Sequence, residues 1–198
     1  MESPQLLWIA ASISLIAGWR LSLSLFATGL AMKMGVIDLP VHVAGLRHLA
    51  SDAVLVVAGT ALIAEMVVDK TAWLDSLWDS GLTFIRPLGG AMLALTVADP
   101  ASLGAQIGAL LLGGSSAYLS HNAKAGARAI LNLSPEPFSN IALSVGEDVV
   151  SLGLIFLVLK APVVAPLVAA MLLFGNLLLN AAVRRTLNRL FTPPRKPS

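Results

Sequence analysis

Residues 5–33 read QLLWIAASISLIAGWRLSLSLFATGLAMK, an apolar run whose centre carries Gly18, Trp19 and Arg20. A helix needs about 20 predominantly apolar residues to cross a bilayer. The run is long enough to cross, and Arg20 is its only charge before Lys33. A glycine close to a charged residue in the middle of such a run favours an interruption. We therefore predict a long membrane helix that is broken near Arg20.

The composition of the whole chain extends this prediction. Of the 198 residues, 57% are hydrophobic and 12% are charged, and the mean hydropathy is +0.83. Soluble domains average about 25% charged residues. So few polar groups could not cover the surface of a soluble protein. The chain has no cysteine, which excludes disulfides, thiolate catalysis and zinc–thiolate sites.

Five further apolar segments follow the first along the chain. Together they predict an all-α, polytopic membrane helix bundle of about six spans, forming a single membrane domain over residues 1–198. Between the second and third spans, residues 70–80 place tryptophan and leucine on one helical face and Asp75 and Asp79 on the other. That pattern favours a short interfacial helix. The five segments are 51–69, 82–98, 101–132, 138–159 and 162–183.

Basic residues predict the orientation. With six spans, both termini share one side, and that side carries most of the lysines and arginines, including the basic tail 184–198. The positive-inside rule then places both termini in the cytoplasm, with the protein in the bacterial inner membrane. A basic tail beside a membrane helix favours contact with anionic lipid over binding of nucleic acid. The opposite side carries only Lys33, Arg47 and Lys160.

The order of segments suggests an internal duplication. Residues 1–99 and 100–190 each contain a long segment followed by two of medium length, and each long segment carries a basic residue among small ones. Three spans per unit would invert the second unit, the plan of many secondary transporters with two broken helices. The alternative is chance resemblance between apolar segments. Gly104 and Gly108 also form a GxxxG pair that would allow close helix packing.

Ionisable residues within the predicted spans are the candidate functional groups. Charges at membrane depth are costly and usually face the interior of a bundle. We expect Arg20 and Lys124 to pair with Glu147 and Asp148. Such pairs could hold helices together, could form a cation or proton pathway, or could bind an anionic head group through the two bases. The candidate pathway residues are Arg20, Glu65, Asp69, His121, Lys124, Glu147 and Asp148.

Catalytic and metal-binding patterns are weak. The chain lacks the GxSxG, HExxH and Walker motifs, so we expect neither an enzyme nor a cofactor. His121 beside Ser120 is the one candidate base for an intramembrane enzyme. His42 and His48 could bind a metal only with other ligands. Asp69, Asp75 and Asp79 would either attract divalent cations at the membrane surface or, as the sequence favours, form a solvated face.

Several motifs occur in the order found in a known family. They are Ala17-Gly18-Trp19-Arg20, Asp69-Lys70-Thr71-Ala72-Trp73-Leu74-Asp75, Arg86-Pro87-Leu88-Gly89-Gly90-Ala91, His121-Asn122-Ala123-Lys124-Ala125-Gly126 and Glu147-Asp148-Val149. Over nearly its whole length the chain resembles the bacterial membrane-protein family named domain of unknown function 4126. The resemblance implies a multi-span fold and no established activity.

A looser similarity concerns residues 65–71. Gdt-type cation/proton exchangers carry Glu-x-Gly-Asp-Lys-Thr in each of two inverted units. This chain has Glu65-Met66-Val67-Val68-Asp69-Lys70-Thr71, with one more residue between the acids and no glycine. The charges at membrane depth, in a suggested inverted repeat, predict a small secondary transporter or exporter with a small ion as ligand. The looser similarity adds the hypothesis that cations are coupled to protons. The alternative is a non-transport membrane scaffold or lipid-handling protein. A homodimer is compatible with either.

Overall fold

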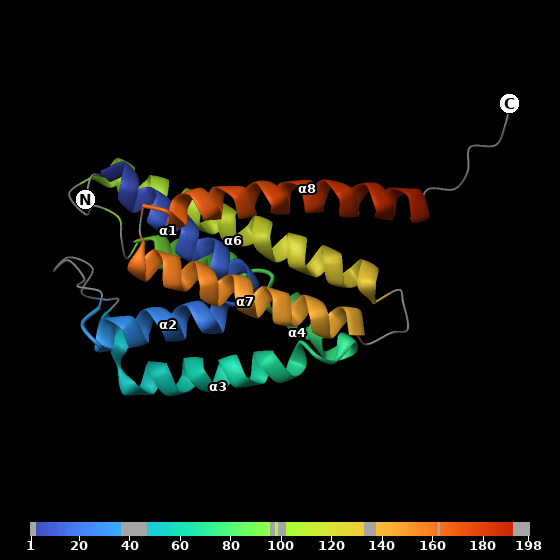
Figure 1. Cartoon of the computed structure of the whole chain (residues 1–198), viewed down its shortest axis with the longest axis horizontal. Helices are drawn as coiled ribbons and strands as arrows, with labels where there is room; N and C mark the ends of the chain where they lie inside the picture. The colour runs from blue at the N-terminus through green and yellow to red at the C-terminus, as the bar shows by residue number, and fades with distance from the viewer. Residues whose placement is uncertain are drawn as a thin grey trace, which may run out of the picture.

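A computed structural model describes residues 3–36, 47–95, 98, 102–132, 138–161 and 163–191. Within these residues the protein is entirely α-helical, with eight helices and no strand (Figure 1). The predicted turns at Pro40, Asp99-Pro100 and 134–137, together with His42 and the end of the basic tail, lie outside the described residues. The helices are α1 (Ser3–Trp19), α2 (Leu21–Lys33), α3 (Asp52–Val68), α4 (Ala72–Leu82), α5 (Ile85–Leu95), α6 (Leu103–Leu131), α7 (Phe138–Lys160) and α8 (Ala165–Phe191).

The predicted break in the first segment is confirmed, and it lies at Arg20. This residue leaves the helical region, with φ −139° and ψ 78°, and separates α1 from α2. Its amide still donates to the carbonyl of Ile16 at 2.7 Å, and its carbonyl accepts from the amide of Ser24 at 3.0 Å. A single residue therefore ends one helix and begins the next.

The chain reverses its direction at this break. Helix α1 runs alongside α6 in the same direction, since Ser14 lies next to Gly113 and Gly18 next to Ala117. Helix α2 runs antiparallel to α3, because Gly29 approaches Leu55 near the start of α3. At the same end, the side chains of Lys33 and Asp52 form an ion pair.

Figure 1 shows the resulting V, whose two open ends lie at the left while Arg20 lies at its tip inside the bundle. Residues 5–33 therefore enter and leave at one end. The prediction that this segment runs from one end of the bundle to the other is wrong, because the local pattern of apolar residues carries no information on the angle at a break.

The remaining helices run from end to end of the bundle. Helices α3, α6 and α8 point one way and α5 and α7 the other, so α1 begins and α8 ends at opposite ends (Figure 1). With the long axis across a membrane, this arrangement disagrees with the prediction that both termini share a side. The inverted repeat is also not confirmed: α1 and α6 would have to be antiparallel, and they run in the same direction. Helix α6 is continuous over 29 residues, so the predicted second break is absent.

Close packing around α6 depends on small residues. A Cβ atom added to Gly113 would lie 2.5 Å from the Cβ of Ala94 and 2.7 Å from the carbonyl oxygen of Gly90, so α5 crosses α6 almost backbone to backbone. The Ser14 hydroxyl donates to the Gly90 carbonyl at 2.7 Å and ties α1 to the same crossing. The predicted packing at Gly104 and Gly108 is wrong, since no other helix in the described part of the chain approaches either residue.

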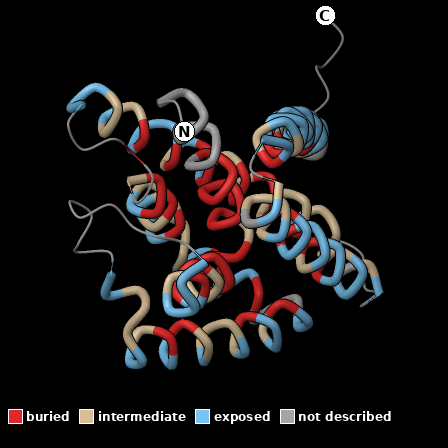
Figure 2. Tube along the Cα trace, turned by 60° about the vertical axis from the view of Figure 1, so that its left-hand side comes forward, coloured by how far each residue is buried: buried red, intermediate tan, exposed pale blue. Residues whose placement is uncertain are grey.

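Buried charges and exposed large apolar side chains distinguish this bundle from a typical soluble protein. The interior holds fully buried Arg20, Arg86 and Arg128, whereas large apolar side chains such as Phe84 and Met171 are 80% and 75% exposed. Figure 2 shows exposed residues along the outer faces of the helices and buried ones toward the centre. By length and hydropathy, two of the described helices could cross a membrane, over Ile141–Val158 and Ala165–Arg189.

Helix α4 shows the same distribution. Asp75 and Asp79 are buried, while Leu77 on the opposite face is 62% exposed. The expectation of a solvated acidic face is therefore wrong. The sequence predicts the two faces of α4 correctly. The acidic face points inward because Asp79 and Asp75 pair with Arg86 and Arg128 in the interior.

Candidate functional site

The break between α1 and α2 leaves backbone carbonyls at the C-terminal end of α1 that need hydrogen-bond donors. Two basic side chains from other helices supply them. Arg86 of α5 donates to the carbonyl of Gly18 at 3.4 Å, and Lys124 of α6 donates to that of Trp19 at 3.2 Å. Cations at a helix C-terminus are also stabilised by the helix dipole. The broken helix therefore positions the bases that organise the site.

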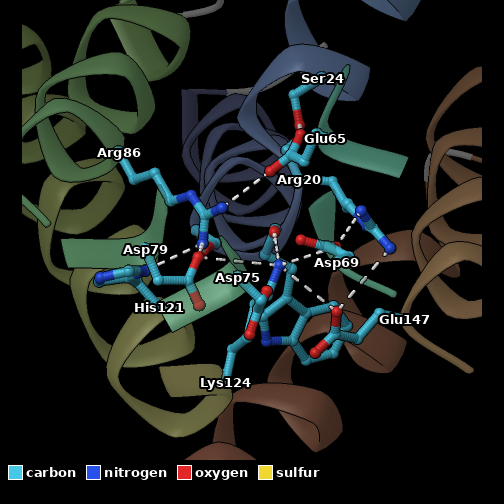
Figure 3. Close-up of polar contacts among 12 residues, drawn as sticks. Arg20, Ser24, Glu65, Asp69, Asp75, Asp79, Arg86, His121, Lys124 and Glu147 are labelled. Atoms are coloured by element: carbon cyan, nitrogen blue, oxygen red, sulfur yellow. Dashed lines mark hydrogen bonds and ion pairs between the residues drawn. The ribbon is translucent and has the colours of Figure 1, made fainter. Parts of the chain in front are cut away.

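Arg20 lies at the tip of the V, is fully buried, and reaches three acids, of which Figure 3 labels Asp69 and Glu147. Its guanidinium pairs with Asp69 at the end of α3 and, at 2.9 Å, with Asp148 of α7. Glu147 lies 4.0 Å away. The hydroxyl of Ser144, one turn earlier on α7, accepts a hydrogen bond at 2.9 Å. Arg20 thus joins the hairpin to α3 and α7, as its predicted pairing with Glu147 and Asp148 requires.

Asp69 and Glu147 are shared by two further bases of α6. Lys124 lies 3.3 Å from Asp69 and 3.5 Å from Glu147. Arg128, one turn later, lies 3.5 Å and 2.9 Å from the same two carboxylates, and its other nitrogen lies 2.9 Å from Asp75 of α4. The predicted pairing of Lys124 with Glu147 is therefore present. Because Arg20 and Lys124 are both paired with acids, neither faces an open site for an anion.

A second group of contacts centres on Arg86. Its guanidinium pairs with Glu65 of α3 at 2.7 Å and with Asp79 of α4 at 2.9 Å. It also lies 3.0 Å from Nδ1 of His121. Both Glu65 and Arg86 are fully buried. Arg86 therefore links α3, α4 and α6 beside the break.

The contacts of His121 determine which nitrogen of its neutral ring carries the proton. Arginine can only donate hydrogen bonds, so Nδ1 of His121 must accept from Arg86. The proton of the neutral ring then lies on Nε2, which is 3.3 Å from the Thr83 hydroxyl. Ser120 points elsewhere and donates to the carbonyl of Leu15 at 2.9 Å. Because its lone pair is already in use and Ser120 is turned away, the geometry does not favour His121 as a catalytic base.

The network contains more acid than base. Six carboxylates surround four basic side chains, which leaves two negative charges when every acid is ionised and His121 is neutral. Buried oxygens without a hydrogen-bond partner include Oε2 of Glu65 and Oδ1 of Asp69. An excess of buried carboxylate can hold protons or a cation. The acids are Glu65, Asp69, Asp75, Asp79, Glu147 and Asp148, and the bases are Arg20, Arg86, Lys124 and Arg128.

All seven candidate residues from the sequence lie in this network, although their role as a pathway stays a prediction. Four further members of the network are not among the candidate pathway residues predicted from the sequence: Asp75, Asp79, Arg86 and Arg128. Two signals could have found them: the acidic face of α4, and the position of Arg128 four residues after Lys124 on one helical face. No group of three or more histidines, aspartates or glutamates in the described part of the chain has the arrangement of a metal site.

Asp75 lies on α4, at the end of the bundle. Its titration is expected to make the stability of the folded protein depend on pH. Burial raises its pKa to about 7, with Arg128 opposing the shift and the neighbouring acids Asp79 and Asp69 adding to it. The folded protein therefore binds this proton more tightly than the unfolded chain between pH about 4 and about 7. Its stabilising contribution is present at low pH and is lost as the pH rises through that window.

The measurement is thermal unfolding of the detergent-solubilised protein across this range. We expect Asp75→Asn, which stays neutral, to flatten the fall in stability with rising pH. Asp52→Asn, at an exposed acid, should keep the wild-type slope. Equal slopes for wild type and Asp75→Asn would contradict the assignment.

Comparison with known proteins adds the family. No curated protein and no solved structure matches the chain significantly. The model of one family matches residues 7–181, which include every residue of the charge network. The chain belongs to the family described as Domain of unknown function (DUF4126).

Proposed function

We propose that this protein is a multi-pass protein of the bacterial inner membrane, with five crossings and one re-entrant hairpin. The crossings are α3, α5, α6, α7 and α8, and the hairpin is α1–α2. The distribution of side chains supports this placement, because apolar residues face outward and the charges lie inside. In water such a surface would aggregate, whereas in lipid it lowers the free energy.

The exposed basic residues support one orientation. Arg184, Arg185 and Arg189 lie at the C-terminal end of α8, and Lys70 lies at the same end of the bundle. The positive-inside rule favours this end in the cytoplasm. The N-terminal end of α1 would then face the opposite side of the membrane.

Within this bundle we assign the charge network the role of a secondary transporter's coupling site, which exchanges cations for protons. The observation that carries the proposal is the excess of two carboxylates around the tip of a broken helix. Broken helices that meet buried charges are the usual form of ion sites in transporters. Asp148 is the most accessible acid of the network, at 24% exposure, and is the expected point of entry.

The chemical basis is competition for the same oxygen atoms. Glu147 and Asp69 each contact both Lys124 and Arg128. A cation or proton that arrives can therefore bind one of these carboxylates while the two bases stay paired with the other. From its charge of −2 with every acid ionised, the network gains one charge when it binds a proton or a monovalent cation and two when it binds a divalent cation. This limits the energetic cost of having a charge at membrane depth, because the total stays close to neutral.

The test is proton flux in proteoliposomes that contain a pH-sensitive dye, during jumps in the outside concentration of monovalent or divalent cations. The dye responds to electroneutral as well as electrogenic exchange. We expect a saturable pH change with the wild-type protein and none with Glu147→Gln or Asp148→Asn. Lys160→Gln, at an exposed base far from the network, should keep the wild-type flux.

Two outcomes would contradict the proposal. The first is the same flux from wild type and Asp148→Asn, a variant that removes the least buried acid and should fold. The second is the absence of flux from folded wild-type protein for every cation tested.

A second candidate function is a membrane scaffold that holds a partner protein. It is favoured by the observation that each base already contacts an acid at about 3 Å, as in a structural network. On this view the charges hold α3, α4, α6 and α7 in register. Co-purification of one partner in fixed stoichiometry, from membranes whose protein shows no flux, would support it.

A further inference from the structure

The exposed face of α8 carries a groove that is separate from the charge network. Its volume is about 350 Å³, and its lining residues recur at helical spacing along a single face. Over about 11 Å of helix this face changes from apolar at Leu177 to basic at Arg184 and Arg185. The lining residues are Leu177, Asn180, Ala181, Arg184, Arg185 and Asn188.

The arginines of the groove differ from those of the interior. Arg20, Arg86 and Arg128 are buried and paired with acids, whereas Arg184 and Arg185 are exposed and have no acidic partner among the described residues. Guanidinium groups recognise phosphate through parallel hydrogen bonds. The positive charges of Arg184 and Arg185 are therefore available to an anion from outside the chain.

The position of the arginines along α8 defines the kind of anion. About 20 residues of helix, starting at Ala165, cover the hydrocarbon thickness and end at Arg184. Val183 packs against Gly126 in the last turns of α6, so Arg184 lies near the end of the bundle. In Figure 1, α8 and α6 separate toward this end. On the N-terminal side of the arginines, α8 exposes the apolar side chains of Phe174 and Leu178.

From these observations we infer that the groove binds an anionic phospholipid, with its phosphate at Arg184 and Arg185 and an acyl chain along Leu177 and the apolar part of α8. The charge of the groove complements the head group, and its apolar half complements the chain. This site differs from the anion site predicted at Arg20 and Lys124, because both of those bases form ion pairs with Asp69. The inference rests on the proposed membrane placement of α8 and is independent of the transport proposal.

The test is native mass spectrometry of the protein taken from vesicles with equal amounts of phosphatidylcholine and phosphatidylglycerol. We expect wild-type protein to retain phosphatidylglycerol preferentially. The double variant Arg184→Gln/Arg185→Gln should bind it about thirty-fold more weakly, because each basic residue at an anionic surface contributes about a factor of five. Both side chains are exposed, so the fold should be unaffected.

A matched control removes two exposed positive charges from the other end of the bundle. Arg47→Gln/Lys160→Gln should retain the lipid as wild type does. Equal retention by the α8 variant and wild type, or equal loss in both double variants, would overturn the site. Displacement of the lipid by millimolar inorganic phosphate would overturn the assignment to a lipid and identify a site for soluble anions.

Discussion

Replacing Arg20 by glutamine is expected to destabilise the folded protein by about 3–5 kcal/mol, the usual cost of removing one partner from a buried ion pair. Arg20 is fully buried and is the group that joins Asp69, Asp148 and Ser144. Without it, carboxylates of α3 and α7 face each other with less compensating charge. The measurement is the midpoint of thermal unfolding in detergent, with near-complete loss of folded protein as the extreme result.

The matched control is Lys33→Gln. It also removes the base of an ion pair, but here the partners are exposed, with Lys33 at 48% and Asp52 at 85%. Exposed pairs contribute about 0–1 kcal/mol. Arg20→Lys should recover part of the loss, because the charge returns but the forked geometry does not. Similar effects of the Arg20 and Lys33 substitutions would contradict a central role for Arg20.

Gly113→Ala is expected to have the second large effect, a destabilisation of about 1–3 kcal/mol or more from overpacking. The added methyl group would lie 2.5 Å from the Cβ of Ala94, 2.7 Å from the carbonyl oxygen of Gly90 and 2.9 Å from the hydroxyl of Ser14. One of these neighbours is backbone, so α5 and α6 would have to separate. The measurement is again thermal unfolding, with gel filtration to detect aggregation.

Gly108→Ala is the control on the same helix. No other helix of the described chain approaches an added Cβ there, so we expect a neutral or slightly stabilising effect, because alanine favours helix over glycine by about 1 kcal/mol. The two substitutions are chemically identical, but only Gly113→Ala should destabilise the protein. Equal effects would mean that α5 does not cross α6 at Gly113.

The sequence predicts local features of this fold well. The break at Arg20 follows from a charge beside Gly18 in an apolar run, and α4 follows from its two distinct faces. The partners of Arg20 and Lys124 follow from the cost of unpaired charge at membrane depth. Each of these inferences depends only on residues close together in the chain, or on opposite charges that must meet.

Features that depend on direction or on distant packing were predicted wrongly. The V at Arg20 needs the carbonyls of Gly18 and Trp19 to meet Arg86 and Lys124, which lie far along the chain. The glycine pair at 104 and 108 matches a packing motif, but the helix α5 arrives at Gly113. A motif shows where close approach is allowed, and only the tertiary arrangement decides where it occurs.

The acidic face of α4 gives the clearest case. Asp75 and Asp79 were expected to face water, as acids on an interfacial helix at a membrane surface would. They face Arg128 and Arg86 instead, while Leu77 faces outward. The buried basic partners therefore decide which face of α4 points inward, and the pattern of α4 alone does not.

The most direct test of the proposed architecture is the side of the membrane from which single cysteines react. The chain has no cysteine of its own, so Ser3→Cys, Met34→Cys and Asn188→Cys can each be probed with a membrane-impermeant maleimide on intact spheroplasts and on inverted vesicles. A re-entrant α1–α2 hairpin with five crossings predicts that positions 3 and 34 react from the outside and position 188 from the cytoplasmic side. Reaction of positions 3 and 34 from opposite sides, or of positions 3 and 188 from the same side, would contradict it.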